Sequence, residues 1–378
     1  MTSFFALLLM KQTGFDPARL AAIPARMRSF VESRQVAGTV VLVQRHGKTV
    51  LLDAQGYANL EERRPMKPDT IFQVMSMTKP VTAIAVVMCA ERGLLNLDDP
   101  VEKYLPSFKA LRVKDGNATR DPKRKLTIRH LLTHTGGLGG IDPGGLDDDA
   151  KRKLPLGTYA DLIPTEPLNR DPGVAMEYSG LGFSTLGRIV EIASGQSFEG
   201  FLGQNVFGPL GMKDTSFFAD PKDYPRIAIT YVGGMKTIEP DPYRRGAKLA
   251  NPAGGLYSTA QDMATLLRCI AEGGTLRGHR ILSPAAVEAM TTVQTGDLPV
   301  DGGDAQGVGL GFFVVKSPSG QTSLKPIGTF GHTGAFGTEF WADRKRGIVA
   351  VFVTQGLDNA SPVRRTFNTM VNAAFVGP

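Results

Sequence analysis

The stretch "IFQVMSMTKPVTAIAVVMCAERG", residues 71–93, raises the question on which the fold and the function depend. Its long apolar run predicts a buried helix. Ser76 and Lys79 stand three residues apart at the start of that run, and residues with this spacing share one side of a helix. A serine hydroxyl is a poor nucleophile unless a base takes its proton, and lysine can be that base when burial lowers its pKa. Lys79 is therefore either the partner of a nucleophile or a solvated charge at a helix end. The S-x-x-K pattern alone, which is common by chance, does not choose between the two.

Two later stretches carry side chains and backbone that suit the same chemistry. In "AMEYSGLGFS", residues 175–184, Tyr178 precedes a predicted helix. Beside a lysine cation its phenol could give up a proton more easily and act as general acid or base. Taken alone, however, this stretch favours a core tyrosine with one hydrogen bond. The stretch "FGHTGAFGTEFW", residues 330–341, reads as a strand whose glycines allow close backbone approach. Such a strand could offer a backbone N–H to an oxyanion.

The order Ser-x-x-Lys, Tyr-Ser-x and His-Thr-Gly resembles the serine β-lactamase and penicillin-binding-protein superfamily. The resemblance covers the whole chain, including "LTIRHLLTHTGGL" and "PAGGLYSTAQDMA", and looks most like the family VIII carboxylesterases, which resemble class C β-lactamases. It implies that Ser76 is the nucleophile and that Lys79 and Tyr178 handle its proton. It further implies that the backbone amides of Ser76 and Ala335 form the oxyanion hole.

The secondary-structure patterns predict strands and helices near both ends of the chain and mainly helices in the middle. The resemblance implies an α/β, β-lactamase-like fold: an antiparallel sheet flanked by helices, completed by both termini, with a helical domain inserted. We expect residues 1–75 and 250–378 to form the α/β domain, residues 76–249 the helical domain, and the active site to lie in the cleft between them. The loop at 139–164 is expected to wall that cleft. The individual predictions are helices at 16–35, 127–137, 179–195, 258–273 and 361–375, a hairpin around "RHGK" at 45–48, and strands at 307–317, 329–344 and 347–356.

Two departures from the penicillin-recognising pattern favour an ester over a lactam. Gly180 stands where those members have an asparagine, so the carboxamide for an acylamino side chain is missing. His332 stands in place of a lysine, and histidine is mostly neutral near pH 7. The prediction is a serine hydrolase that cleaves small carboxylic esters through an acyl-enzyme, with weak β-lactam hydrolysis as a side activity. His332, Gly334 and Phe336 are the expected substrate contacts.

The alternatives are an acyltransferase, a D-amino-acid peptidase or a β-lactamase on the same site, and, from another class, a non-catalytic scaffold or sensor. An inactive scaffold has no reason to retain Ser76, Lys79 and Tyr178 together. Phe330, Phe336 and Trp341 could line an acyl pocket or pack in the core.

The charge and the cysteines exclude several other classes of function. The net charge is +7 and the pI about 9.3, but the basic runs at 120–130, 243–246, 343–347 and 363–365 are scattered beside turns and predict solvated surface and no nucleic-acid partner. Cys89 and Cys269 lie in apolar segments and are expected to be free thiols. His130 and His134 share a helix face, but no third ligand accompanies them, so packing and capping are favoured over a metal site. No metal or cofactor is predicted.

The apolar leader "MTSFFALLLMKQTG" lacks a preceding positive charge and a cleavage site, so it does not fit a signal peptide. No segment reaches the roughly 20 apolar residues that span a bilayer. We therefore expect a cytoplasmic protein without membrane association, whose leader could support a homodimer.

Overall fold

The computed structural model describes residues 13–140, 142–232, 235–238, 246–298, 305–317, 324–356 and 360–377. The apolar run at 4–10 and most of the basic run at 243–246 therefore lie outside the described residues. The helices are α2 (Pro17–Glu32), α3 (Thr78–Glu91), α4 (Ile128–Leu132), α5 (Asp148–Lys153), α6 (Leu156–Leu162), α7 (Gly180–Ser194), α8 (Phe198–Leu202), α9 (Gly208–Leu210), α10 (Ala260–Ala271), α11 (Pro284–Thr291) and α12 (Ala360–Ala374). The strands are β1 (Gly38–Arg45), β2 (Lys48–Asn59), β3 (Arg64–Pro65), β4 (Phe72–Gln73), β5 (Val113–Asp115), β6 (Ala118–Arg120), β7 (Thr230–Val232), β8 (Met235–Ile238), β9 (Tyr257–Ser258), β10 (Thr275–Leu276), β11 (His279–Arg280), β12 (Gln306–Val308), β13 (Phe313–Val315), β14 (Phe330–Thr333), β15 (Glu339–Asp343) and β16 (Ile348–Thr354).

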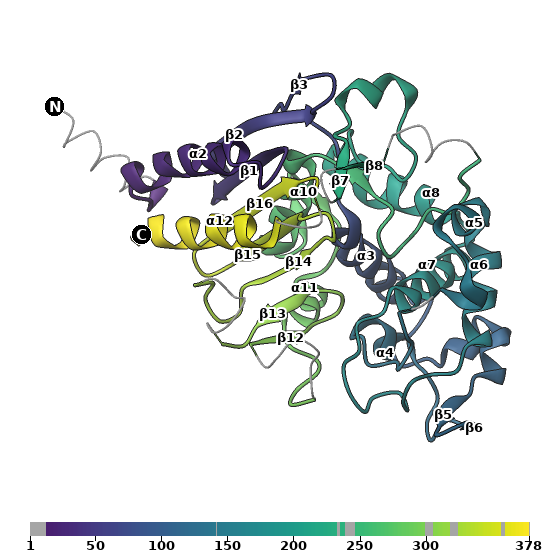
Figure 1. Ribbon diagram of the computed structural model, residues 1–378. Coiled ribbons are helices and arrows are strands. Elements are labelled where there is room, and N and C mark those ends of the chain that lie inside the picture. The colour runs from purple at the N-terminus through teal and green to yellow at the C-terminus, as the bar shows by residue number, and fades with distance from the viewer. Residues whose placement is uncertain are drawn as a thin grey trace.

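An eight-stranded sheet in the order β12-β13-β14-β15-β16-β1-β2-β3 forms the centre of the α/β part (Figure 1). Its strand pairs are antiparallel, and β1 lies directly against β16, with Leu42 opposite Val351. Segments from both ends of the chain therefore meet in the middle of one sheet. The predicted fold class, with the antiparallel sheet completed from both ends, is confirmed.

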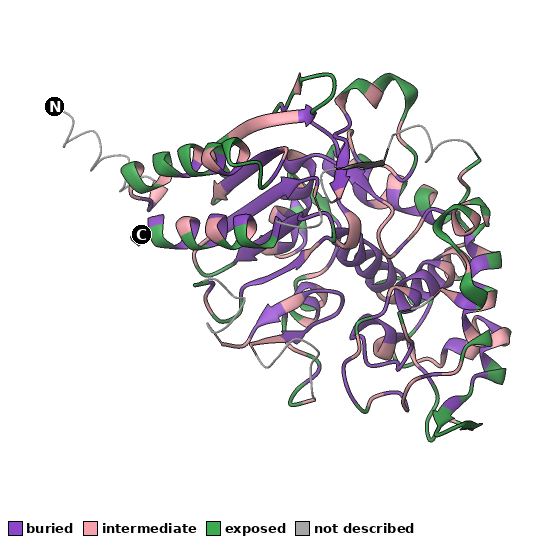
Figure 2. Ribbon diagram, in the orientation of Figure 1, coloured by how far each residue is buried: buried purple, intermediate pink, exposed green. Residues whose placement is uncertain are grey.

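Helices cover both faces of this sheet, which explains why the central strands are apolar throughout. Successive side chains of a strand point to opposite faces. Val41 and Val43 accordingly join the core beneath α2 and α12, whereas Val40 and Leu42 join the larger core that includes α3 and α10. Figure 2 shows β1, β16 and α3 buried almost along their whole length.

Sequence signals for helix ends hold at several places. The Asp16 side chain caps α2 and Pro17 occupies its first turn, as predicted, and α7 ends at Gly195 in the left-handed conformation. α4 ends at Leu132, before the glycine pair expected to end it, because Thr133 and His134 leave the helical conformation.

The part between α3 and α10 is mostly helical and packs against α3 through α7 (Figure 1). It also contains two small hairpins, β5–β6 and β7–β8. The segment at 139–164, expected as a loop, contains α5 and α6; Asp147 caps α5 with its side chain, and Leu156, Tyr159 and Ala160 bury one side of α6. The domain boundaries at 75/76 and 249/250 stay predictions.

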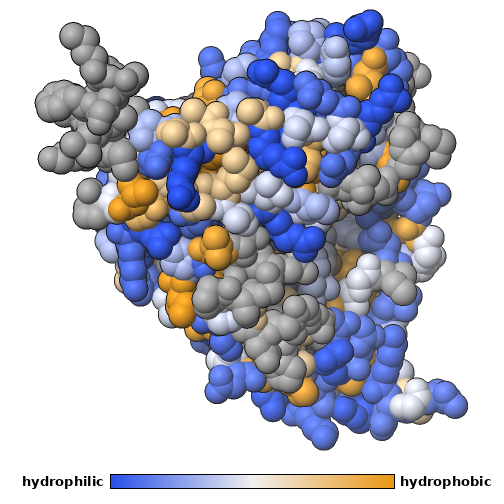
Figure 3. Space-filling model, turned by 60° about the vertical axis from the view of Figure 1, so that its left-hand side comes forward, coloured by the Kyte–Doolittle hydropathy of each residue, from blue (hydrophilic) through white to orange (hydrophobic). Residues whose placement is uncertain are grey.

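Among the described residues, no helix combines the length and the hydrophobicity that a membrane crossing needs. On the face shown in Figure 3, strongly hydrophobic residues are scattered singly or in small groups among hydrophilic ones. Such scatter is normal for a protein surface.

A buried charge cluster joins α12 to the strands that carry the His-Thr-Gly motif. Glu339 of β15, opposite Thr333 in the sheet, contacts Lys325 and lies 3.5 Å from Arg364 of α12. Asn368 also donates a hydrogen bond to Glu339, at 2.6 Å. Burial alone raises the pKa of Glu339, but the Lys325 and Arg364 charges outweigh it and hold that pKa below its ordinary value.

Replacing Glu339 by Gln should lower the free energy of unfolding by about 3–5 kcal/mol, because it leaves Lys325 and Arg364 without their buried counter-charge. Urea unfolding at pH 7 measures this loss. Glu288→Gln, which breaks an ion pair whose carboxylate is 69% exposed, should cost less than about 1 kcal/mol. Equal losses in the two variants would contradict the role given to the cluster.

Candidate active site

Ser76 lies in a single 3₁₀ turn, Met75–Met77, that leads directly into α3. Met75 has a φ of 50°, in the left-handed region that residues other than glycine rarely adopt. Backbone strain of this kind, of order 1–3 kcal/mol, concentrates at functional sites. The turn leaves Ser76 just ahead of the helix that carries Lys79.

The Lys79 amine is buried against Ser76, which excludes the solvated helix-end alternative. Its Nζ donates to Ser76 Oγ at 3.0 Å and to the carbonyl of Ala253 at 2.7 Å, and the residue is only 2% exposed. Burial lowers the pKa of Lys79 to about 7. A large share of the molecules therefore carries a neutral amine at neutral pH, which can accept the Ser76 proton.

Tyr178 completes the group from an irregular segment just before α7, but its phenol is less acidic than expected. Its hydroxyl is hydrogen-bonded to Ser76, and burial still raises the pKa of Tyr178 to about 12. The Lys79 amine lies 4.8 Å from the centre of the ring and so faces the ring surface. The expectation that a neighbouring lysine makes this phenol acidic is wrong. A neutral phenol can still pass a proton on by donating one and accepting another.

The turn after β14 lies directly against Val74 and Met75, the two residues before Ser76. Gly334 N–H donates to Thr338 O at 2.7 Å, and Thr338 Oγ1 donates to Val74 O at 3.0 Å. A Cβ at Gly334 would come within 2.4 Å of Val74 O, so only glycine allows this approach. The close packing brings Ala335 to the cavity that Ser76 also lines.

A cavity of about 300 Å³ opens beside these groups. It is lined by Ser76, Tyr178, Thr333, Gly334, Ala335, Gly337, Ala360, Ser361 and Arg364. The first turns of α12 thus contribute a wall that the sequence interpretation missed. Arg364, taken as part of a solvated basic run, is a largely buried cation, with its side chain 13% exposed. The only available signal was its position in a predicted helix, which does not indicate what the helix packs against.

The other expected substrate contacts are placed differently. His332 is 4% exposed and Phe336 7% exposed, and neither lines the cavity, whereas Gly334 does. The Nδ1–H of His332 donates to Thr333 O at 2.7 Å, and burial lowers the pKa of His332 to about 3, with the Lys79 charge adding to the effect. Its imidazole is therefore neutral.

Phe330 and Trp341, which the sequence left open as pocket or core residues together with Phe336, belong to the core. Trp341 is 2% exposed and its Nε1–H donates to Asn368 Oδ1 at 2.8 Å. Phe330 packs edge-on against Phe312. Cys89 and Cys269 are buried and unpaired, as predicted.

His130 caps a helix, as the sequence favoured. His130 N–H donates to Thr127 Oγ1, and Thr127 N–H donates back to His130 Nδ1, which forms a capping box at the start of α4. In the described part of the chain, no three histidine, cysteine or acidic residues come together as a metal site would require.

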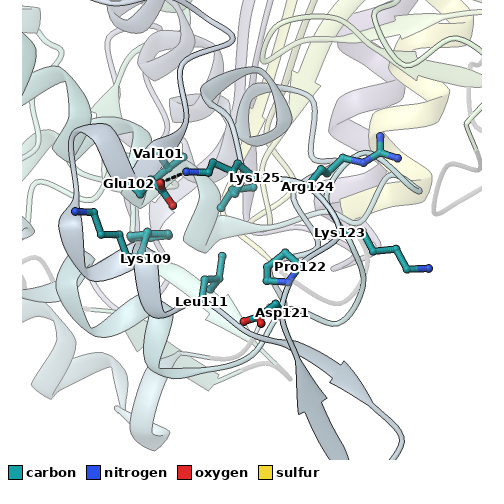
Figure 4. A pocket seen from close by; sticks show the side chains of 11 residues that line it. Val101, Glu102, Lys109, Leu111, Asp121, Pro122, Lys123, Arg124 and Lys125 are labelled. Carbon is teal, nitrogen blue, oxygen red and sulfur yellow. Dashed lines mark hydrogen bonds and ion pairs between the residues drawn. The ribbon is translucent and has the colours of Figure 1, made fainter.

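A second cavity, of about 280 Å³, lies in the helical part and has no comparable convergence of groups (Figure 4). Lys125 points across it and pairs with Glu102. Lys123 and Arg124 extend away from it in Figure 4. Its cations therefore do not gather around one ligand position.

Comparison with known proteins agrees with this geometry. The chain matches the family model named Beta-lactamase over residues 23–374. It belongs to the β-lactamase family.

It is 31% identical over 378 residues to the esterase EstB of Burkholderia gladioli, covering 90% of this chain and 91% of that protein. It is also 31% identical over 356 residues to Protein Rv1367c of Mycobacterium tuberculosis, covering 88% of each. The solved structure of EstCE1, a hydrolase with promiscuous acyltransferase activity, has a TM-score of 0.78 and 23% identity and covers 94% of this chain and 99% of that chain. At this identity the likeness shows the fold.

The pH dependence of the reaction at Ser76 distinguishes Lys79 from His332 as the group that controls it. Reaction with a serine-directed phosphonate should accelerate as pH rises, with a midpoint near 7, because the Lys79 amine accepts a proton only when neutral. Lys79→Arg, which stays protonated, should remove the reaction over the whole range. A flat profile between about pH 5.5 and 8.5 in the wild type would contradict this assignment, since His332 titrates far below that range.

Gly334→Ala should lower the rate of phosphonate labelling by roughly 10²–10³-fold, because the added Cβ pushes the turn and its Ala335 amide away from Ser76. Gly203→Ala is the matched control, since a Cβ there meets nothing within 4 Å. Comparable labelling of both variants would mean that the turn does not serve the reaction.

Proposed function

We propose that this member of the β-lactamase family is a carboxylesterase that cleaves small carboxylic esters through an acyl-enzyme on Ser76. The observation that carries the proposal is the Lys79 amine, whose pKa burial lowers to about 7 and which lies 3.0 Å from Ser76 Oγ. The similarity to the esterase EstB supports an ester as the substrate.

In the proposed cycle, Ser76 Oγ attacks the ester carbonyl carbon while its proton passes to the neutral Lys79 amine. The carbonyl oxygen becomes an oxyanion, which accepts hydrogen bonds from the Ser76 and Ala335 N–H groups. The C–O bond to the alcohol then breaks, and the leaving oxygen takes a proton that reaches it from Lys79 through the Tyr178 hydroxyl. Water attacks the acyl-enzyme in the same way and releases the carboxylic acid, which regenerates Ser76 and neutral Lys79.

Esters suit this site better than lactams for two local reasons. Gly180 offers no carboxamide for an acylamino side chain. A side chain would fit at this position, because an added Cβ would meet only Ala253 Cβ, at 3.6 Å. The neutral, buried His332 supplies no cation for a substrate carboxylate. Arg364 lies on the α12 wall of the cavity but is paired with the buried Glu339, so only weak β-lactam hydrolysis is expected as a side activity.

Acyl transfer is the second candidate, because the acyl-enzyme accepts any nucleophile that reaches it. EstCE1, which shares the fold, is described as a hydrolase with promiscuous acyltransferase activity. The cavity beside Ser76 has room for an alcohol next to a bound acyl group. Adding methanol to the esterase reaction and measuring methyl ester against free acid separates the two activities.

The wild type should hydrolyse p-nitrophenyl esters and cleave a chromogenic cephalosporin at least about tenfold more slowly, for the reasons given by Gly180 and His332. Ser76→Ala should lower ester turnover by on the order of 10³-fold or more, because it removes the attacking atom. Initial rates over a series of acyl lengths measure both effects. Ser107→Ala, which changes a serine in the helical part, should leave the rates unchanged.

A cephalosporin rate above the ester rate would contradict the ester assignment. Absence of turnover together with absence of phosphonate labelling at Ser76 would point to the scaffold alternative. Labelling without hydrolysis would point to acyl transfer.

A further inference from the structure

His134 is a buried residue of the "LTHTGG" stretch, which lies beside the proposed site but contributes no atom to the cavity. We propose that His134 is a positioning residue, which holds the two residues flanking Tyr178 and so keeps the phenol directed at Ser76. This inference rests on the proposed role of Tyr178 in the reaction.

His134 accepts two hydrogen bonds, from the residues on either side of Tyr178. Glu177 N–H donates to the His134 carbonyl at 2.7 Å, and Ser179 N–H donates to His134 Nδ1 at 3.1 Å. Both donors are backbone groups, one on each side of Tyr178. Their positions fix the peptide planes from which the tyrosine side chain extends.

The imidazole also supports the tyrosine ring from the side. The ring centres of His134 and Tyr178 are 4.5 Å apart with an angle of 33° between the planes, and Phe183 packs against the same imidazole at 5.0 Å. His134 is therefore held between Tyr178 and the first turns of α7. A shift of its ring would move the phenol with it.

Tyr178 needs such support because the segment 176–179 has no regular secondary structure, and because Tyr178 is 37% exposed and lines the cavity. The adjoining helix begins only at Gly180, with Ser179 as its cap. The hydroxyl must nonetheless stay within hydrogen-bonding reach of Ser76. A misplacement of about 1 Å costs on the order of 10²-fold in rate.

The geometry argues against a direct part for His134 in proton transfer. Its Nδ1 lone pair already accepts the Ser179 N–H, so the other ring nitrogen carries the hydrogen of the neutral imidazole and cannot accept a proton from the phenol. Burial, together with the Lys79 charge, holds the pKa of His134 well below its ordinary value, so the neutral form that accepts this hydrogen bond persists. The backbone is constrained as well, with φ at 56°.

The test compares His134→Asn with His134→Gln. Asn places its carbonyl oxygen where Nδ1 lies, so it can still accept the Ser179 N–H, and it tolerates a positive φ. Gln places its carbonyl one bond farther out. We expect His134→Asn, which keeps the hydrogen bond from Ser179 N–H but loses the ring contact with Tyr178, to lose only about threefold in phosphonate labelling rate and in kcat for a p-nitrophenyl ester. His134→Gln, which loses both contacts, should lose about 10- to 100-fold in the same two quantities, with KM changed less than about threefold.

A double-mutant cycle separates positioning from general destabilisation. In a Tyr178→Phe background the difference between the Asn and Gln variants should shrink to within about twofold, because no hydroxyl remains to be positioned. A full difference in that background would overturn the inference. So would equal losses in His134→Asn and His134→Gln when both unfold at the wild-type urea midpoint.

Failure of the proposed function gives a different result. Wild-type protein whose Ser76 is not labelled, or Tyr178→Phe as reactive as wild type, would contradict the catalytic roles themselves. The positioning role alone would be contradicted if Ser76 is labelled in the wild type and Tyr178→Phe reacts slowly, but His134→Asn and His134→Gln react at the same rate.

Discussion

The site depends on the burial of one amine. Lys79 is almost completely removed from water, and its Nζ is held by Ser76 Oγ and the Ala253 carbonyl. An ammonium group in such surroundings is costly, and its pKa falls until the neutral form competes at neutral pH. The same burial that creates this base also requires that α3, the segment at 251–255 and the turn after β14 pack tightly around the start of one helix.

That requirement explains the local backbone around Ser76. The left-handed Met75, the glycine at position 334 and the carbonyl of Ala253 all lie close around Ser76 and Lys79. Around them, the imidazoles of His134 and His332 are both neutral, so neither adds a second positive charge beside Lys79. The permanent cation of the cavity wall, Arg364, is instead paired with the buried Glu339.

Site residues with a recognisable spacing could be predicted from the sequence. Residues that act through their backbone, or that reach the site only through tertiary packing, could not. Ser76 and Lys79 could be paired because a helix relates residues three apart, and the two-ended sheet followed from strand patterns together with the family resemblance. The Ala253 carbonyl could not be found in this way, since every residue has one. The pKa of Tyr178 was expected to move in the wrong direction, because the extent of burial outweighs a neighbouring charge and cannot be read from residue order. His332 was taken for a substrate contact because a motif position does not show which way a side chain turns.

The pairing of β1 with β16 has a consequence for how this molecule is made. Thr39 lies opposite Thr354, so a central strand of the sheet has no partner on that side until nearly the entire chain has left the ribosome. Until then the backbone N–H and C=O groups along that edge of β1 have no partner strand, and pairing between such distant segments is slow. The helical middle can form local contacts during synthesis, whereas β14, which carries Thr333 and leads into Gly334, is made after it. The surroundings of Ser76 are thus completed late in folding, and an unpaired strand edge that persists for so long favours aggregation.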